Sequence, residues 1–252
     1  MEIATMPIRP VIGISPDNQA ADQPNPVYEL PMVYALAIEK AGGIPILLPH
    51  TADPAMRAAY MGLIDGLLIP GGNDLDPSLY GQAPHPTMRR LDSLRQKFDL
   101  AMLALAQDQN MAVLGICLGC QAMNVQRGGS LHQYIPDVRR DNPIAHAGNP
   151  ADSTDKNVWH SVSLARHARL RAILKCDQAA VNSRHRQAID RLGAGLTACA
   201  ESADGLVEAI EDDSLKFWIG VQWHAETLVD APHAELFNAF IAAAAMKVNR
   251  SR

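Results

Sequence analysis

Short runs of consecutive apolar residues alternate with segments of helical periodicity through the first half of the chain. The runs predicted to be strands are 11–14, 44–48, 66–69 and the run that ends at Cys117. The segments predicted to be helices are 30–41, which stops before Gly42-Gly43, 54–63 and 92–107. Strands without polar alternation are typical of a parallel sheet that is covered on both faces. The sequence therefore predicts an α/β fold with a doubly wound, mostly parallel central sheet flanked by helices.

The second half of the chain has a different pattern. Short runs at 160–164, 206–211 and 217–223 favour a small antiparallel portion, and residues 232–246 are predicted to form a closing helix. The polar stretch 141–157 contains Pro and Gly, so we expect a mobile loop there. No repeat or linker divides the sequence. We therefore expect one catalytic domain over residues 1–252.

Composition narrows the class of protein. The 252 residues are 48% hydrophobic and carry a formal net charge of −5, which argues against a basic surface for nucleic acid. No apolar run reaches the length of a membrane span, and the N-terminus lacks the pattern of a secretory signal. Four cysteines in a chain of this length do not predict a disulfide framework. We expect a cytoplasmic protein that acts on a small molecule, and the sequence leaves a homo-oligomer open.

One segment carries the first candidate for chemistry. The residues Gly115-Ile-Cys117-Leu-Gly119 stand between an apolar run and a helix-compatible stretch, as in a nucleophile elbow with cysteine as the nucleophile. A sharp strand-to-helix turn has no room for side chains two positions before and after the nucleophile, which accounts for both glycines. The helix N-terminus also favours a thiolate on Cys117. The alternative is a buried structural cysteine at a strand end.

A second segment supplies a base. The predicted strand 217–223 runs directly into His224-Ala225-Glu226. Residues i and i+2 of an extended chain point to the same side, so we expect Glu226 to bind one nitrogen of His224 while the other faces Cys117. The three residues would then be nucleophile, base and orienting carboxylate. The alternative is a solvated surface pair of histidine and glutamate.

The spacing Cys117-x-x-Cys120 has two other interpretations, a redox pair or half of a metal site. A second such spacing is missing, because Cys176 and Cys199 stand alone. A redox pair would also leave His224 without a task. We therefore interpret Cys120 as a small, buried helix residue, and we expect neither a metal nor a cofactor.

Two glycines follow the strand predicted at 66–69. Gly71 and Gly72 can bring bare backbone close to a substrate, and acyl transfer needs N–H donors for the developing oxyanion. The amides of Gly72 and Leu118 are the candidates for this oxyanion hole. The alternatives are an ordinary glycine turn and a phosphate loop, but the Lys-Ser/Thr of a phosphate loop is absent.

The Cys117 and His224-x-Glu226 motifs together resemble the class I glutamine amidotransferase superfamily. Further segments are similar to its γ-glutamyl-γ-aminobutyrate hydrolase family, which acts in polyamine breakdown; they are Pro70–Gly81, Asn124-Val125 with Gly128-Gly129, Val181–Gln187 and Ala203–Glu211. The resemblance covers nearly the whole chain. It implies hydrolysis of a γ-glutamyl amide, such as γ-glutamyl-GABA or a γ-glutamyl polyamine, through a thioester on Cys117. Leu118 and Ala225 depart from the arginine and proline usual in that family.

The resemblance also assigns residues to the substrate. It implies that Gln121 and Ser161 hold the glutamyl end and that His185 lines the pocket. Asp76 and Tyr80, with Asp74, would lie on the side of the leaving amine, where carboxylates would favour a distal cation such as that of a polyamine. The alternative is that the aspartates only cap their loop.

Two competing functions remain at the level of sequence. The first is a glutaminase component that passes ammonia to a partner synthase, which the absence of a fused synthase disfavours. The second is a non-catalytic small-molecule binder on the same fold, which the presence of Cys117, His224 and Glu226 disfavours.

Overall fold

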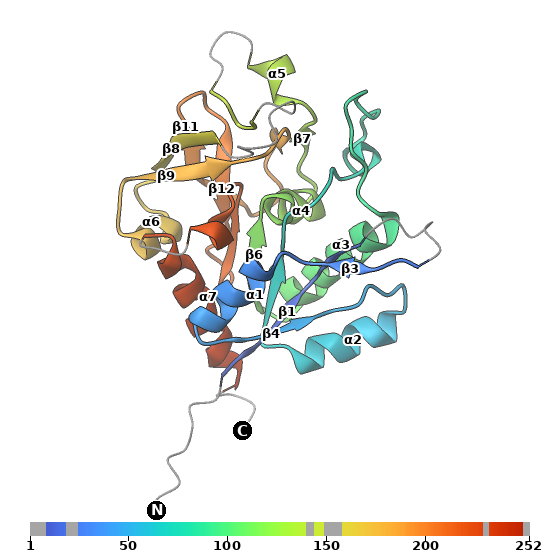
Figure 1. The fold of residues 1–252 in the computed structure, drawn as a ribbon. Coiled ribbons are helices and arrows are strands. Elements are labelled where there is room, and N and C mark those ends of the chain that lie inside the picture. The colour runs from blue at the N-terminus through green and yellow to red at the C-terminus, as the bar shows by residue number, and fades with distance from the viewer. Residues whose placement is uncertain (1–8, 19–24, 140–143, 149–157, 229–231, 249–252) are drawn as a thin grey trace, which may run out of the picture.

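A single large sheet organises the computed structural model, which describes residues 9–18, 25–139, 144–148, 158–228 and 232–248 (Figure 1). In this part of the chain the sheet has 11 strands. Five of them run parallel, in the spatial order β4 (Ile44–Leu47), β1 (Val11–Ile14), β5 (Gly66–Ile69), β6 (Ala112–Ile116) and β13 (Trp218–Val221). The carboxyl ends of these strands therefore meet at one edge of the sheet.

The sheet continues from β13 as an antiparallel portion. Its strands follow in the order β12 (Val207–Glu211), β11 (Thr197–Ser202), β8 (Val158–Leu164) and β9 (Gln178–Ser183). The short β10 (Ala188–Ile189) pairs with both β12 and β7 (Leu131–His132). A separate two-stranded sheet joins β2 (Asp17–Asn18) to β3 (Tyr28–Glu29). The predicted fold class, a mostly parallel sheet with a small antiparallel portion, is confirmed.

Helices cover both faces of the parallel strands. One hydrophobic core lies between the sheet and α1 (Met32–Lys40), α6 (Arg169–Leu174) and α7 (Ala234–Val248). A second lies between the other face and α2 (Pro54–Leu63), α3 (Ser93–Asp108) and α4 (Leu118–Gln126). Neighbouring side chains of β6 divide between them, since Leu114 belongs to the first core and Val113 to the second. Such strands must be apolar on both faces, which explains the unbroken runs in the sequence.

The ends of the helices follow local chemistry. The helix predicted at 30–41 begins at Met32, with Pro31 at its N-cap, and the helix predicted at 92–107 begins at Ser93. Asp92 is the N-cap of the latter, where its carboxylate accepts hydrogen bonds from the amides of Leu94 and Arg95 at 3.0 and 2.9 Å. Asp53 caps α2 in the same way. In the described part of the chain, no helix is both long and apolar enough to cross a membrane.

Parts of the second half differ from the sequence predictions. The strand predicted at 217–223 is limited to Trp218–Val221, and β9 and β11 were not singled out by the apolar pattern. Most of the predicted loop 141–157 lies outside the described residues. Within it, residues 144–148 are described, and His146 is buried there. The short α5 (Ile135–Val138) precedes this segment.

Candidate active site

Cys117 lies in a strained turn between β6 and α4. Its backbone has φ 54° and ψ −105°, a region that side chains with a Cβ rarely adopt. The amide of Cys117 donates a hydrogen bond to the carbonyl of Val221 on β13 at 2.8 Å. The residue is 8% exposed. The turn therefore presents the sulfur at the carboxyl edge of the sheet, as in a nucleophile elbow.

The two glycines of the elbow are required by close packing. A Cβ on Gly119 would lie 2.0 Å from the carbonyl oxygen of Ile69, which is backbone and cannot move aside. A Cβ on Gly115 would lie 2.4 Å from the sulfur of Met123 and 2.7 Å from the carbonyl carbon of Gly119. The expectation that side chains have no room at these positions is confirmed.

His224 and Glu226 form the expected hydrogen-bonded pair. His224 Nδ1 lies 2.7 Å from Glu226 Oε1, and the carboxylate is 1% exposed. The contact does not arise in an extended strand, as the sequence suggested. Instead, β13 has already ended, and His224 is the N-cap of a 3-10 turn, η2 (Ala225–Thr227). The turn brings the Glu226 carboxylate back to the imidazole.

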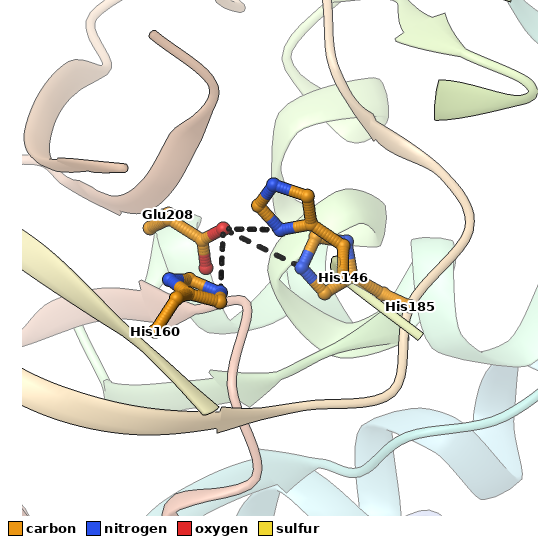
Figure 2. A group of neighbouring side chains, drawn as sticks. All are labelled: His146, His160, His185 and Glu208. Carbon is orange, nitrogen blue, oxygen red and sulfur yellow. Dashed lines mark ion pairs between the residues drawn. The ribbon is translucent and has the colours of Figure 1, made fainter. Parts of the chain in front are cut away.

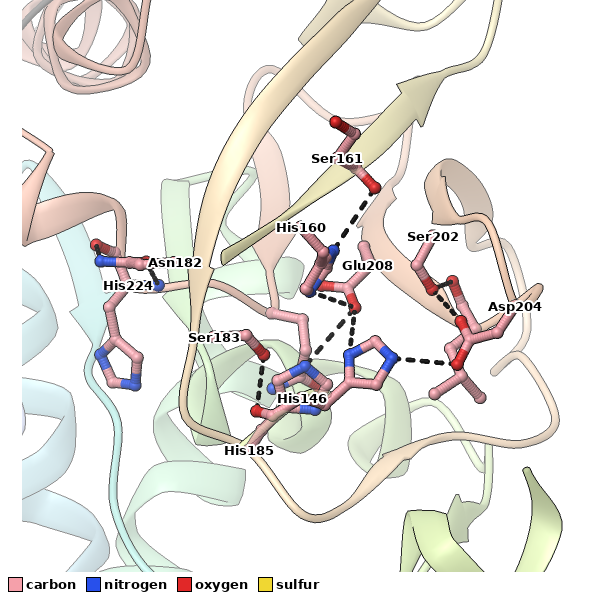
Figure 3. Close-up of polar contacts among 12 residues, drawn as sticks. His146, His160, Ser161, Asn182, Ser183, His185, Ser202, Asp204, Glu208 and His224 are labelled. Atoms are coloured by element: carbon pink, nitrogen blue, oxygen red, sulfur yellow. Dashed lines mark hydrogen bonds and ion pairs between the residues drawn. The ribbon is translucent and has the colours of Figure 1, made fainter. Parts of the chain in front are cut away.

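Asn182 at the end of β9 fixes the backbone of the histidine. The amide of His224 donates to Asn182 Oδ1 at 2.9 Å, and Asn182 Nδ2 donates to the His224 carbonyl at 3.2 Å (Figure 3). Asn182 Nδ2 also donates to Thr227 Oγ1 at 2.6 Å. No local pattern in the sequence marks Asn182 as part of the site. These bonds show that the antiparallel portion of the sheet positions the candidate base.

The surroundings of His224 favour its charged form. Burial lowers its pKa, but the negative charge of Cys117, a hydrogen bond to that side chain and the Glu226 carboxylate together raise the pKa to about 9. Arg184 also approaches the carboxylate oxygen that faces the imidazole, with Nη2 3.7 Å from Glu226 Oε1. The surroundings of the ring thus favour an imidazolium on His224 at neutral pH.

The glycine turn after β5 lies against the same pair. A Cβ on Gly71 would lie 3.1 Å from His224 Cε1 and 3.7 Å from Cys117 Cβ, so only a bare backbone fits closely here. Gly72 adjoins Leu118, since a Cβ on Gly72 would lie 2.7 Å from Leu118 Cδ2. The amide of Leu118 belongs to the first turn of α4, where amides have no acceptor within the helix. Gly72 and Leu118, whose amides are the candidate oxyanion donors, are therefore in contact.

A buried arginine that the sequence analysis missed holds this turn. The Arg95 side chain is 0% exposed and donates to the carbonyls of Gly71 at 2.9 Å and Pro70 at 3.3 Å. Its charge is balanced by Asp17 at 2.9 Å and by Asp99 at 3.3 Å. Burial raises the pKa of Asp99 to about 6, although Arg95 and a hydrogen bond from Ser15 oppose the rise. A buried ion pair so close to the turn fixes its carbonyls.

Two cavities meet beside the candidate nucleophile. The first, of about 100 Å³, is lined by Cys117 and by the loop after β9; the other lining residues are Gly72, Asn73, Asp74, Arg89, Gln121, Arg184, His185, Arg186 and Gln187. The second, of about 270 Å³, is lined by His224 and Glu226 together with apolar residues of the α1 region and the carboxylates of Asp17 and Glu29. Gly72 and Arg184 line both cavities.

The structure brings some of the predicted substrate residues to these cavities. Gln121 lines the smaller one, where its Nε2 donates to Gln222 Oε1 at 3.0 Å. His185 lines it as well, and its Nδ1 lies 2.8 Å from the carbonyl of Gln187. Cys120 is completely buried and packs against Gly220 of β13, as the sequence interpretation expects.

Three other predicted residues lie away from both cavities. Ser161 is exposed on β8, because alternate residues of that strand, His160 and Val162, point inward. Asp76 caps the 3-10 helix η1 (Pro77–Tyr80), where Oδ1 accepts from the Ser78 amide at 3.0 Å. Tyr80 packs against the core on the α3 side. The loop-capping alternative therefore describes Asp76.

Comparison with known proteins agrees with this geometry. The family model Peptidase C26 matches residues 10–226. The chain belongs to the Peptidase C26 family. It is 33% identical over 199 residues to the γ-glutamyl-γ-aminobutyrate hydrolase of Escherichia coli K12, covering 77% of this chain and 76% of that protein. It is also 36% identical to a Mycobacterium tuberculosis protein that is named only provisionally as a glutamine amidotransferase, covering 94% of this chain and 75% of the relative.

A solved structure shares the fold. The glutaminase domain of Trypanosoma brucei CTPS, solved with bound acivicin, superposes with a TM-score of 0.65 at 19% identity, over 95% of this chain and 94% of that one. The fold and family expected from the sequence resemblance are confirmed. The family unites hydrolases and amidotransferases, so membership of the family does not by itself define the substrate.

The elbow glycines yield a stability prediction. Gly119→Ala should lower the free energy of unfolding by about 3 kcal/mol, the upper end of the usual cost of overpacking, because a clash with backbone cannot be relieved by a side-chain shift. Gly62→Ala is the matched control, since a Cβ on Gly62 in α2 meets nothing within 4 Å, and it should be neutral or stabilising by up to about 1 kcal/mol. Urea unfolding measures both. Equal stability of the two variants would contradict the proposed crowding.

The charge of His224 yields a pH prediction. Because its folded-state pKa is raised from 6.5 to about 9, its protonation adds stability that is fully present below about pH 6.5 and is lost as the pH rises through about 9. Titration of labelled histidines by NMR should show this pKa, and Glu226→Gln should lower it because a neutral amide cannot stabilise the imidazolium. Glu201→Gln, an exposed site on β11, should leave it unchanged. A pKa that does not respond to Glu226→Gln would remove Glu226 from the pair.

Proposed function

We propose that the protein hydrolyses γ-glutamyl amides through a γ-glutamyl thioester on Cys117. The observation that supports this most directly is the juxtaposition of an elbow cysteine, a charged His224 and the Glu226 carboxylate 2.7 Å from its ring. The relationship to a γ-glutamyl-γ-aminobutyrate hydrolase supports the choice of bond. We propose the same role in polyamine breakdown that the resemblance to this hydrolase family implies.

The acylation step uses the charge already present. The Cys117 thiolate attacks the amide carbonyl carbon, a C–S bond forms, and the carbonyl oxygen becomes an oxyanion that accepts from the amides of Gly72 and Leu118. The C–N bond then breaks, and the His224 imidazolium gives its proton to the leaving amine. The amine departs neutral before it takes up a further proton from solvent. Glu226 keeps the imidazole oriented throughout.

Deacylation reverses the role of the histidine. Neutral His224 removes a proton from a water molecule as its oxygen attacks the thioester carbonyl. The C–O bond forms, the C–S bond breaks, and glutamate leaves while Cys117 returns as a thiolate beside the imidazolium. The cycle is balanced by one water molecule and needs no metal ion at the sulfur.

The smaller cavity matches the glutamyl end of the substrate. A γ-glutamyl group carries an α-carboxylate and an α-ammonium, so it needs both signs of charge. Arg184 and Arg186 supply cations in this cavity, while Asp74 supplies a carboxylate. Arg186 Nη2 lies 3.3 Å from Asp74 Oδ2, which holds the two groups in a fixed relation. We assign the zwitterionic end to this pair of charges.

The larger cavity would receive the leaving amine. It lies on the His224 side of Cys117, where the proton must be delivered, and Leu30, Val33 and Tyr34 give it an apolar wall. Such a wall suits the methylene chain of GABA or of a polyamine, whereas the ammonia released from glutamine would leave it unfilled. The Leu118 side chain does not reach this cavity because it is buried against Gly72.

The nucleophile is tested by a pair of cysteine variants. Cys117→Ala should lower kcat for γ-glutamyl-GABA by at least about four powers of ten, because triad members act as a unit. Cys120→Ala, one helical turn away, should retain activity. Mass spectrometry after acid quench should detect a γ-glutamyl adduct on wild type and none on Cys117→Ala. Turnover by a folded Cys117→Ala protein at the wild-type rate would refute the mechanism.

The substrate class is tested by comparing kcat/KM for γ-glutamyl-GABA, γ-glutamyl-putrescine and glutamine. At least one conjugate should exceed glutamine by about tenfold or more, since even one packed methylene is worth about 10-fold. Asp76→Asn should leave the ratio of the two conjugates unchanged, because Asp76 caps η1. Preference for glutamine would instead favour the glutaminase component. Failure of all three substrates would favour a non-catalytic binder.

A further inference from the structure

Three histidines and a glutamate converge beside the smaller cavity, which His185 also lines, and Figure 2 shows their four side chains. Glu208 Oε1 on β12 lies 3.2 Å from His146 Nδ1, 3.6 Å from His160 Nε2 and 3.4 Å from His185 Nε2. The four side chains are between 0% and 5% exposed. They come from four separate segments of the chain, and all four facing atoms lie within 4.8 Å of one another.

Each ring has an inner nitrogen that faces Glu208 and an outer nitrogen that points away from it. The outer nitrogen of each ring lies beside a hydrogen-bond acceptor. His146 Nε2 lies 3.1 Å from Asp204 Oδ2, and His160 Nδ1 lies 3.4 Å from the Ser161 carbonyl (Figure 3). His185 Nδ1 lies 2.8 Å from the Gln187 carbonyl. A carbonyl and a carboxylate can only accept, so each outer nitrogen carries the hydrogen. In a neutral imidazole the inner nitrogen then carries a lone pair and no hydrogen. All three of these lone pairs face the Glu208 carboxylate.

This arrangement leaves four acceptors facing one another in a buried space. In the described part of the protein, the three inner nitrogens and both Glu208 oxygens have no hydrogen-bond donor. Buried acceptors without a donor are costly, and their mutual repulsion adds to the cost. Either additional protons on these groups or a metal cation must occupy the space between them. The burial and the number of nitrogen ligands favour a cation.

We propose that His146, His160, His185 and Glu208 bind a divalent transition-metal ion, for which Zn²⁺ is the best chemical match. Imidazole nitrogen with carboxylate oxygen is a ligand set suited to zinc. Bonds of about 2.0–2.1 Å in a tetrahedron place ligand atoms about 3.3 Å apart, close to the three contacts of Glu208. The outer contact of His146 with Asp204 is the carboxylate–histidine arrangement that orients metal ligands.

The site would be structural rather than catalytic. Four protein ligands fill a tetrahedral zinc site and leave no position for substrate or water. The ion would tie β8 and β12 to residue 146 and to the loop after β9. His185 lines the cavity beside Cys117, and the Glu208 carbonyl accepts from the Gln222 amide at 2.7 Å. Gln222 in turn accepts from Gln121, so the ion would stiffen the wall that faces the glutamyl group.

The prediction that no metal is needed rested on the missing second Cys-x-x-Cys spacing, a signal that is local in the sequence. These ligands stand at positions 146, 160, 185 and 208, and no two of them are close enough in sequence to form a recognisable motif. Antiparallel pairing of β8 with β9 and of β11 with β12 brings them together. The proposal is independent of the substrate, and the reaction on Cys117 does not use the ion.

Metal content and spectroscopy test the site in the intact protein. Purified chain loaded with Zn²⁺ and passed through a desalting column should retain one ion per chain by elemental analysis. Replacement by Co²⁺ should give the intense visible bands of a tetrahedral site without a thiolate charge-transfer band. Removal of the ion by a chelator should lower the melting temperature, and Zn²⁺ should restore it. A wild-type protein that retains no ion and whose melting temperature ignores the chelator would overturn the proposal in favour of a protonated network.

Variants locate the ion. His160→Ala and Glu208→Gln should lose it, while Asp204→Asn, which removes only an outer contact, should weaken Zn²⁺ binding by about 10–100-fold. Cys117→Ala and His167→Asn, an exposed histidine outside the cluster, should bind Zn²⁺ like wild type. If His160→Ala and Glu208→Gln do not fold, the Zn²⁺ affinity of Asp204→Asn and the Co²⁺ spectrum of the wild-type protein test the site instead. Full Zn²⁺ affinity in Asp204→Asn together with a thiolate band, or retention of the ion in His160→Ala, would overturn the site.

Discussion

The close approach of α4 to the end of β5 is the constraint on which the candidate site depends. The Cα of Gly119 packs so near the Ile69 carbonyl that a Cβ would lie 2.0 Å from it. Since Ile69 is followed by the Pro70-Gly71-Gly72 turn, the same approach brings that turn beside Cys117 and Leu118. One backbone contact thus sets the direction of the sulfur and the position of both candidate oxyanion donors. Side chains larger than hydrogen at the elbow would separate them.

The site also joins the two portions of the sheet. Cys117 and the glycine turn belong to the parallel strands, whereas His224 is held by Asn182 from the antiparallel strand β9. The register of β13, which pairs with β6 on one side and β12 on the other, connects them. The hydrogen bond from the Cys117 amide to Val221 fixes the elbow to the same strand. The relative position of nucleophile and base therefore depends on sheet pairing together with the turn that follows β13.

The sequence predicted the parallel half well because every strand there is apolar on both faces. Turn residues also separate each helix from the strands on either side of it. It also predicted the elbow at Cys117 and the contact between His224 and Glu226, since both signals are local in the sequence. It failed where position depends on pairing between distant strands. Ser161 was expected at the substrate, but the alternation of β8 turns it outward and His160 inward. Asp76 was placed at the leaving amine, but its own loop uses the carboxylate as a cap.

Buried charge explains most of what the sequence analysis missed. Arg95, Asp99 and Glu208 are residue types that usually lie at the surface, and nothing in their local pattern marks them as buried. Each becomes interpretable only when its partners are seen, because a buried charge must be compensated. Arg95 is compensated by Asp17 and Asp99 and supports the glycine turn. The three facing imidazoles compensate Glu208 fully only if protons or a metal ion accompany them. That requirement links the chemistry of an internal cluster to the rigidity of the cavity wall beside Cys117.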